Sequence, residues 1–409
     1  MNISHCRICG GPHLVPYLNL GTTPAADSFV SIGEMYQEDP VYPLEVCLCT
    51  TCGMSQLGYT VPPEVLYKFD YPYESSTTKT GRDHFHGLAK SIVDRFSLNS
   101  TDLIVDVGSN VGVLLEGFEN QGCRTLGIEP AGRIAQLALE RGISTINEFI
   151  SPDLANRIVA GNGLASVVCI TNVFAHIHDL DGFMEAVGKL LKASGVLVIE
   201  APHFVRLLDH LEYDTIYHEH LLYVSVRPLN HLFNRYGFEV FDVEEMPIHG
   251  GTVRIFVSRV GENKPTEALA RLISCEEMTG AFDLERLRRF SEAVRSHRLQ
   301  LVDLLRSLKS EGNTLAGVSA PAKGMTLLNY CGIGTDLLDF ITEKSTFKIG
   351  RLTPGAHIPV LPDSELISRN PDYVLLLAWN FADEIISNLS EYRSRGGKFI
   401  IPIPKPRIV

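Results

Sequence analysis

The densest group of chemically active side chains in this 409-residue chain is the run Tyr217-His218-Glu219-His220. Two histidines around a glutamate suit general acid–base catalysis, because an imidazole titrates near neutral pH and a neighbouring carboxylate raises its basicity and fixes its tautomer. The run has neither the HExxH spacing nor the nearby third ligand of a helical zinc site. Because apolar residues flank it, we expect some of these groups to be partly buried. The alternative is a solvated polar turn.

Cysteine spacing near the N-terminus predicts a separate metal site. Five of the nine cysteines lie in the first 52 residues, and two CxxC pairs, Cys6/Cys9 and Cys49/Cys52, are each followed by glycine. Two such turns direct four thiolates at one tetrahedral Zn²⁺, which leaves no open position, so the ion is expected to be structural. Cys47 is out of phase and is expected to be buried in a strand. The stretch 14–45 is interpreted as too irregular to fold without the metal.

The stretch 103–118 predicts a nucleotide-binding unit. Residues 103–107 form an apolar run that ends at Asp106 and Val107 and indicates a buried parallel strand, and a helix is expected from residue 113. The turn between them contains Gly108, Ser109, Asn110 and Gly112. A second strand over 125–128 ends in Glu129, twenty-one residues after the first glycine of the turn, where a carboxylate can accept both ribose hydroxyls of an adenosine. The GxxxG spacing and the acid at the strand end favour S-adenosylmethionine (SAM) over NAD. The alternative is a loop whose glycines only permit close packing.

Further strands place these groups at one edge of a sheet. Strands are predicted at 167–170 and 195–200, followed by a pair at 238–243 and 253–257. The loop inside that pair is too short for a helical crossover, so the pair is antiparallel. An antiparallel pair that closes a parallel sheet distinguishes a class I methyltransferase from a plain Rossmann fold. His176, after the strand at 167–170, is expected to face the same crevice.

Composition excludes several classes of protein. The 45% apolar content indicates a globular protein, and the net charge of −12 argues against a nucleic-acid partner. The polar N-terminus predicts no signal peptide, and the longest apolar run, 373–379, is too short to span a bilayer. We therefore expect a cytoplasmic protein without a membrane partner.

The last third of the chain predicts another α/β unit. A long amphipathic helix over 282–310 leads into strand-like runs at 315–318, 340–341, 373–377 and 399–401. A small-residue turn with Lys323 and Gly324 follows the first of these strands and opens a helix, which suits a diphosphate. The alternative is a packed turn with a surface lysine. Trp379 could stack on a base, and Asn380 would share that crevice.

Taken together, these motifs resemble the sugar C-methyltransferases of deoxysugar biosynthesis, which act on nucleotide-linked keto-sugars. The resemblance covers essentially the whole chain. Its motifs are the CxxC pairs, 106–110, 172–176, 217–220 with 249–251, 320–324 and 376–380. One departure is Val111, where the family usually carries aspartate.

The expected fold is α/β, with a class I methyltransferase Rossmann-like sheet, a small N-terminal zinc lobe and a second, C-terminal α/β Rossmann-like domain. The expected limits are 1–65 for the zinc-binding lobe, 66–260 for the SAM-binding methyltransferase domain, 261–310 for a helical connection and 311–409 for the nucleotide-sugar-binding domain. We expect a monomer.

The resemblance also implies roles for individual residues. His220 would remove the proton next to the ketone, in a pocket shared with Tyr71, His176, Tyr217 and Glu219. Cofactor contacts would come from Asp106, Gly108, Ser109, Asn110, Gly112, Glu129, Pro130 and Asn172. Substrate contacts would come from Lys323, Gly324, Trp379, Asn380 and His249.

The expected reaction is SAM-dependent methylation of a carbon next to a ketone, at C3 of a dTDP-linked 4-keto deoxysugar. Alternatives are methylation at C5 and a catalytically silent sugar-nucleotide-binding protein. An NAD-dependent sugar dehydrogenase is disfavoured by the GxxxG loop and by the absence of a Tyr-x-x-x-Lys pair.

Overall fold

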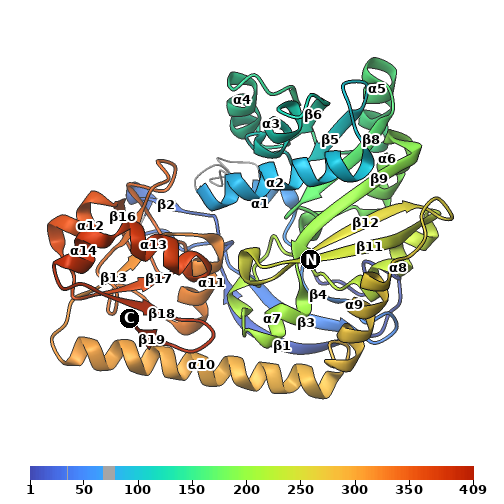
Figure 1. Ribbon diagram of the computed structural model, residues 1–409. Coiled ribbons are helices and arrows are strands. Elements are labelled where there is room, and N and C mark those ends of the chain that lie inside the picture. The colour runs from blue at the N-terminus through green and yellow to red at the C-terminus, as the bar shows by residue number, and fades with distance from the viewer. Residues whose placement is uncertain (35, 68–78) are drawn as a thin grey trace.

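The largest sheet of the computed structural model has seven strands between two layers of helices (Figure 1). The structure describes residues 1–34, 36–67 and 79–409. In spatial order the strands are β11 (Phe238–Met246), β12 (Thr252–Arg259), β9 (Leu191–Pro202), β8 (Ala165–Thr171), β5 (Leu103–Val107), β6 (Arg124–Ile128) and β7 (Thr145–Ile146). Only the β9–β12 and β12–β11 pairings are antiparallel. The predicted class I methyltransferase sheet, with its closing antiparallel pair, is confirmed.

Helices cover both faces of this sheet because its central strands are apolar on both sides. In β5, Leu103, Val105 and Val107 face one core and Ile104 faces the other. One layer contains α2 (Lys79–Phe96), α3 (Val113–Glu119) and α4 (Gly132–Glu140). The other contains α5 (Pro152–Asn162), α6 (Leu180–Leu190), α7 (Phe204–Asp209) and α8 (Val226–Arg235).

The N-terminal lobe is built on a four-stranded antiparallel sheet. Its order is β1 (Leu14–Thr23), β3 (Tyr42–Cys49), β4 (Ser55–Leu57) and β10 (Leu222–Tyr223). The expectation that 14–45 is irregular is wrong for β1, a ten-residue strand. Two register shifts in the β1–β3 pairing interrupt the alternation of buried and exposed residues. For that reason the period of two that marks a strand is missing from the sequence.

The C-terminal domain contains a second, mostly parallel sheet. Its order is β16 (Val360–Pro362), β14 (Ile341–Glu343), β13 (Leu315–Val318), β17 (Tyr373–Leu376), β18 (Lys398–Ile401) and β19 (Arg407–Ile408), and only β19 is antiparallel to its neighbour. The helices of this domain are α11 (Ala322–Cys331), α12 (Ser364–Arg369), α13 (Ala382–Asn388) and α14 (Ser390–Ser394). The predicted second Rossmann-like domain is therefore present.

Two helices, α9 (Glu267–Met278) and α10 (Leu284–Ser310), connect the two α/β sheets. Helix α10 begins two residues later than predicted, because the Asp283 side chain accepts the Glu285 amide and caps it. It runs along the base of the molecule from the N-terminal lobe to the C-terminal domain (Figure 1). No helix in the described ranges is long and apolar enough to cross a membrane.

Short elements join the lobe and the domains. Strand β2 (Val30–Ser31) of the N-terminal lobe pairs with β15 (Arg351–Leu352) of the C-terminal domain. Strand β10 lies far along the chain yet completes the N-terminal sheet, so that sheet crosses the proposed limit at residue 65.

The remaining elements are α1 (Pro63–Tyr67) and the 3₁₀ helices η1 (Ile32–Glu34), η2 (Phe174–His176), η3 (Tyr213–Thr215), η4 (Ile248–Gly250) and η5 (Trp379–Phe381).

One buried carboxylate fixes the start of α8. Glu276, on α9, is 0% exposed; its oxygens accept the backbone N–H groups of Val226 (2.7 Å) and Arg227 (3.0 Å) and face Nε2 of His203 at 3.0 Å. It thus replaces a conventional capping side chain, since Ser225 makes no side-chain cap bond.

Replacing Glu276 by alanine should lower the free energy of unfolding by about 3 kcal/mol, because two buried amides and one imidazole lose their partner. Urea unfolding gives this value. Glu277→Ala is the matched control: its side chain is 53% exposed and lies 3.6 Å from Arg227, so it should have little effect. Equal losses in the two variants would refute the capping role.

Candidate functional site

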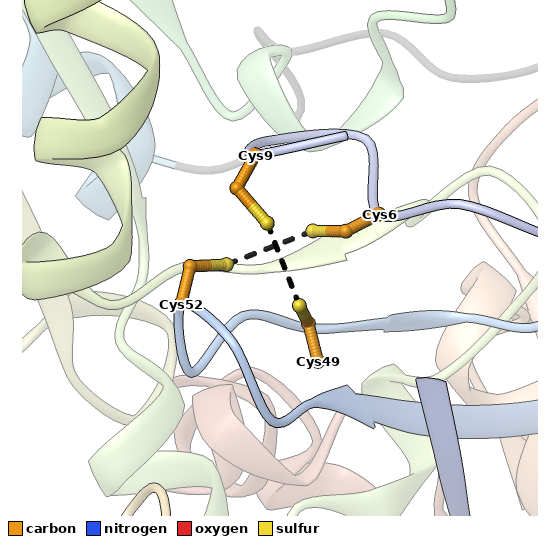
Figure 2. Close-up of side chains that lie close together, drawn as sticks. All are labelled: Cys6, Cys9, Cys49 and Cys52. Atoms are coloured by element: carbon orange, nitrogen blue, oxygen red, sulfur yellow. Dashed lines mark hydrogen bonds between the residues drawn. The ribbon is translucent and has the colours of Figure 1, made fainter. Parts of the chain in front are cut away.

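Four cysteine thiols converge in the N-terminal lobe (Figure 2). The Sγ–Sγ distances are 3.6 Å for Cys6–Cys52 and for Cys9–Cys49, and all four sulfurs lie within 4.8 Å of one another. Thiolates at ~2.3 Å around a tetrahedral zinc ion would lie ~3.8 Å apart. The predicted set therefore fits a closed Zn²⁺ site, which has a structural role.

Backbone amides shape the first of the two metal-binding turns. The N–H of Ile8 donates to Sγ of Cys6, and the N–H of Gly11 donates to Sγ of Cys9, both at 3.4 Å. These bonds stabilise thiolates against like-charge repulsion. Cys47 is buried in β3, as predicted, and is not one of the four.

A cavity of about 340 Å³ lies at the carboxyl edge of the seven-stranded sheet. Most of the predicted cofactor residues line it: Asp106, Gly108, Ser109, Asn110, Glu129, Pro130 and Asn172. Gly112 is not among the lining residues. Its φ is +81°, and a Cβ there would lie 2.8 Å from Ile143, so this glycine permits close packing at the start of α3. Val111 is buried in a small apolar cluster with Val113, where a carboxylate would lack a partner.

The turn before α3 brings backbone close to the cavity. Gly108 has φ +73°, and a Cβ there would lie 2.6 Å from the side chain of Val173. Only glycine fits that position, since a side chain would have to displace the segment after β8. Asn110 also has a positive φ, and its N–H donates to Glu129 at 2.9 Å.

The cavity is acidic. Carboxyl groups in its lining come from Glu64, Asp106, Glu129 and Asp179, and none of the described lining residues is Lys or Arg. Burial and the nearby charge of Glu129 raise the pKa of Asp106 well above its usual range, and burial raises that of Glu129. Such a lining attracts the sulfonium and ammonium of SAM and repels the diphosphate of NAD.

The carboxylate of Glu129 already holds the loop. One oxygen accepts the N–H of Asn110 and the other accepts that of Ala131 at 2.8 Å. Each carboxylate oxygen has a second lone-pair site, so bonds to ribose hydroxyls remain available. Glu129 can therefore both shape the loop and recognise a ligand.

The predicted acid–base run follows η3. His220 Nδ1 lies 2.8 Å from the carbonyl of Thr215, and Nε2 lies 2.8 Å from the hydroxyl of Tyr217. Because a carbonyl can only accept, Nδ1 carries the hydrogen and Nε2 keeps its lone pair, to which Tyr217 donates. The expectation that Glu219 selects the tautomer is wrong, since the partner is a main-chain carbonyl. Burial lowers the pKa of His220 to about 4, so the ring is neutral at physiological pH.

A second histidine connects this run with the cavity. The rings of His176 and His220 are 4.9 Å apart, edge to face, and Nδ1 of His176 lies 3.1 Å from the hydroxyl of Tyr67. Both Tyr67 and His176 line the cavity. Burial and the neighbouring histidines lower the pKa of His176 well below its usual value. The structure thus places the predicted base one ring away from the cofactor cavity.

The centre of the run is buried. Glu219 is 2% exposed, and burial together with the charge of Asp27 raises its pKa to about 8. His218 is 1% exposed and its Nε2 lies 3.2 Å from the carbonyl of Tyr42 in the N-terminal lobe. The alternative of a solvated polar turn is therefore wrong, and His218 anchors the run to the lobe.

The predicted substrate residues form a second cluster beside the same run. Lys323 donates to the side-chain oxygen of Asn380 and lies 4.3 Å from the ring centroid of Trp379. The indole N–H of Trp379 donates to Asp214 at 2.6 Å. Burial lowers the pKa of Lys323, although the charges of Asp214 and Glu212 oppose that shift. Lys323 is thus half-buried and hydrogen-bonded to Asn380.

Two predicted residues lie beyond what the structure describes. Tyr71 is outside the described ranges, and the side chain of His249, in η4, is not described. Gly324 is buried, and a Cβ there would lie 2.8 Å from Leu377.

Other residues of the site were missed. Tyr67, the last residue of α1, bonds His176. Phe85, Phe149 and His178 also line the cavity. Asp214 lies three residues before Tyr217, and its closeness in sequence to the predicted acid–base run was the signal that could have identified it.

Substituting Cys52 by serine should yield poorly soluble, zinc-free protein, because four-thiolate binding contributes on the order of 10 kcal/mol to folding a small lobe. Metal content and soluble yield are the measurements. Cys275→Ser, at a cysteine outside the group of four, should keep one zinc ion per chain. A Cys52→Ser protein that stayed folded without metal would contradict the assignment.

Comparison with known proteins gives family matches along most of the chain. Models of a zinc binding domain, a methyltransferase domain and a C-methyltransferase C-terminal domain match residues 6–67, 82–243 and 247–404. The C-methyltransferase NovU of Streptomyces niveus is 34% identical over 408 residues, which cover 100% of this chain and 97% of that protein.

Solved structures are similar to part of the chain. The PH0226 protein of Pyrococcus horikoshii OT3 shares 13% identity over 47% of this chain and 97% of its own, with a TM-score of 0.36. The magnesium protoporphyrin IX methyltransferase of Synechocystis PCC 6803, solved with bound S-adenosylhomocysteine (SAH), shares 12% identity over 46% and 90%, with a TM-score of 0.35.

The similarity to NovU spans the zinc-binding lobe, the SAM-binding domain and the C-terminal domain in one order. This chain therefore belongs to the family of SAM-dependent C-methyltransferases that carry an N-terminal zinc-binding domain.

Proposed function

We propose that this C-methyltransferase acts on a nucleotide-linked keto deoxysugar, dTDP-linked and methylated at C3 next to a 4-keto group. One observation carries the proposal. The run from Asp214 to His220 contacts the cluster of Lys323 and Trp379 at one end and the cavity-lining His176 at the other. A ligand with a nucleotide at one end and an acidic C–H at the other fits that arrangement.

The chemistry requires a base and oxygen donors. A sugar carbon becomes nucleophilic only when the proton next to a ketone is removed, so that the electron pair moves onto the carbonyl oxygen as an enolate. His220 would accept that proton at Nε2, which is unprotonated at neutral pH. Tyr217, which donates to Nε2 in the free protein, would then donate to the enolate oxygen.

SAM supplies an electrophilic methyl group on a sulfonium. Transfer of that methyl from sulfur to the enolate carbon would release SAH and restore the ketone. The protein's own contribution is to hold the carbon in line and keep water out. Glu219, with its pKa raised to about 8, would remain protonated at neutral pH and act as a second donor.

The C-terminal cluster would hold the nucleotide. The N–H groups at the start of α11 and the ammonium of Lys323 suit a diphosphate. Trp379, whose ring lies beside Lys323, would be the aromatic side chain that stacks on a base.

His220→Asn should bind both ligands nearly normally and transfer methyl groups at least about a hundredfold more slowly, since a positioned base contributes roughly 10²–10⁴-fold. The same variant should lose exchange of the substrate's α-proton with deuterated solvent in the presence of SAH. His231→Asn, at an exposed histidine of α8, is the control.

If exchange persists in His220→Asn while methylation fails, His220 only orients the enolate. If both persist, the catalytic assignment fails. NMR of the product locates the methyl group, so a product methylated at C5 would contradict the C3 proposal.

The pH profile of kcat/KM should fall on both sides of neutrality. On the acid side, activity is lost as His220 gains a proton near pH 4; on the alkaline side, it is lost as Glu219 loses its proton near pH 8. Glu219→Gln keeps a donor without a titratable proton, so its profile should stay flat through pH 8 to 9. An unchanged alkaline limb in this variant would exclude the donor role.

Glu129→Ala should weaken SAM binding by about 1–3 kcal/mol, the cost of unpaired ribose hydroxyls and of a loosened loop. Calorimetric titration with SAM measures this change. Glu148→Ala changes a 45% exposed glutamate of the following segment and should leave the affinity unaltered. Equal affinities of wild type and Glu129→Ala would place the adenosine elsewhere.

A further inference from the structure

The turn that carries the proposed substrate lysine has a strained backbone. Ser319, directly after β13, has φ +67°, a left-handed conformation that costs a non-glycine residue free energy. Such a conformation persists only when neighbouring groups hold it. The next residues, Ala320 to Gly324, enter α11 and include Lys323.

Two side chains hold this turn at Ala320. Glu343 accepts the Ala320 N–H at 2.7 Å, and Nζ of Lys348 donates to the Ala320 carbonyl at 2.8 Å. The peptide groups on both sides of Ala320 are therefore fixed. Both side chains belong to one segment, which runs from the end of β14 to β15.

The oppositely charged partner of Lys348 lies in the zinc lobe. Its ammonium lies 3.3 Å from Asp27 of the zinc lobe and 5.0 Å from the ring centroid of Phe29. The two charged side chains are only 6% and 9% exposed. An ammonium buried to this extent depends on its carboxylate, because neither is well solvated.

The segment around Lys348 contacts the other parts of the protein. Strand β15, just after it, pairs with β2 of the zinc lobe, and the guanidinium of Arg133, on α4, lies 3.8 Å from the ring centroid of Phe347. The zinc lobe thus reaches the proposed substrate turn through a buried ion pair, and the SAM-binding domain touches the same segment.

We infer that Asp27 and Lys348 are positioning residues for the proposed substrate: their ion pair holds Ser319 in its left-handed conformation and so sets the affinity for the nucleotide diphosphate. The inference rests on the proposed function of Lys323. The zinc lobe would then have a second role besides its own folding: it would help to shape the proposed nucleotide site in the C-terminal domain.

Trp379 allows a direct test, because it is the only tryptophan of the chain and lies beside Lys323. Thymidine diphosphate is titrated into the full-length, zinc-loaded protein, and tryptophan fluorescence is followed. Lys348→Met should raise the dissociation constant about tenfold, because the Ala320 carbonyl loses its donor. The affinity for SAM and the zinc content should not change. Lys309→Met removes a more exposed lysine, paired with Asp339 at 2.8 Å, and should have no effect.

A rescue experiment separates strain from general damage. Glycine adopts a positive φ without steric cost, so adding Ser319→Gly to Lys348→Met should restore most of the affinity. Asp27→Asn should weaken binding in the same direction and add little to Lys348→Met, because both act on one interaction. If Lys348→Met does not fold, Asp27→Asn with and without Ser319→Gly makes the same comparison.

Unchanged nucleotide affinity in Lys348→Met and Asp27→Asn would overturn the inference. The inference would also be overturned if adding Ser319→Gly did not restore the nucleotide affinity of Lys348→Met. Lys348 would then not act through the backbone conformation of the turn. A parallel loss of SAM affinity would indicate general damage and would likewise overturn the inference. Lys323→Ala tests the proposed function itself: unchanged thymidine diphosphate binding in that variant would mean that the turn is not the nucleotide site.

Discussion

The position of the proposed catalytic run depends on the main-chain hydrogen bonds on either side of Leu221. Its N–H donates to the carbonyl of Ala175, beside His176, and its carbonyl accepts the N–H of Leu57 in the zinc lobe, both within 3.0 Å. Strand β10 then continues the pairing with β4. Because three distant segments meet at one residue, His220 cannot shift without disturbing both the cofactor domain and the zinc lobe.

This arrangement explains why the zinc site matters although no thiolate faces the cavity. Zinc ties the N-terminal segment to the β3–β4 hairpin, and the hairpin supports β10 and, through Tyr42, His218. The same lobe pairs with the C-terminal domain through β2 and β15. The N-terminal lobe thus contacts both the proposed catalytic run and the C-terminal domain that carries the proposed nucleotide site.

Burial also decides the charge states at the site. Desolvation keeps the two neighbouring imidazoles neutral and raises the pKa of Glu219, so a base and an acid coexist near neutral pH. Desolvation acts in the same way in the cofactor cavity: it raises the carboxyl pKa values of Asp106 and Glu129, and a cationic cofactor would favour their ionised forms.

The class I sheet, the four zinc ligands, the glycine loop and α10 could be predicted from the sequence alone. Each has a local hydrophobic periodicity or a characteristic residue spacing. Tertiary structure decided the rest. Register shifts in the β1–β3 pairing removed the alternating hydrophobic pattern from the sequence of β1. Strand β10 has two residues and is too short to show such a pattern. The tautomer of His220 is set by the carbonyl of Thr215, which any residue type could supply. Contacts such as Tyr67 with His176, Trp379 with Asp214 and Lys348 with Asp27 join residues more than a hundred positions apart. The local sequence does not predict such pairs, because only the packing of the completed fold brings the two residues together.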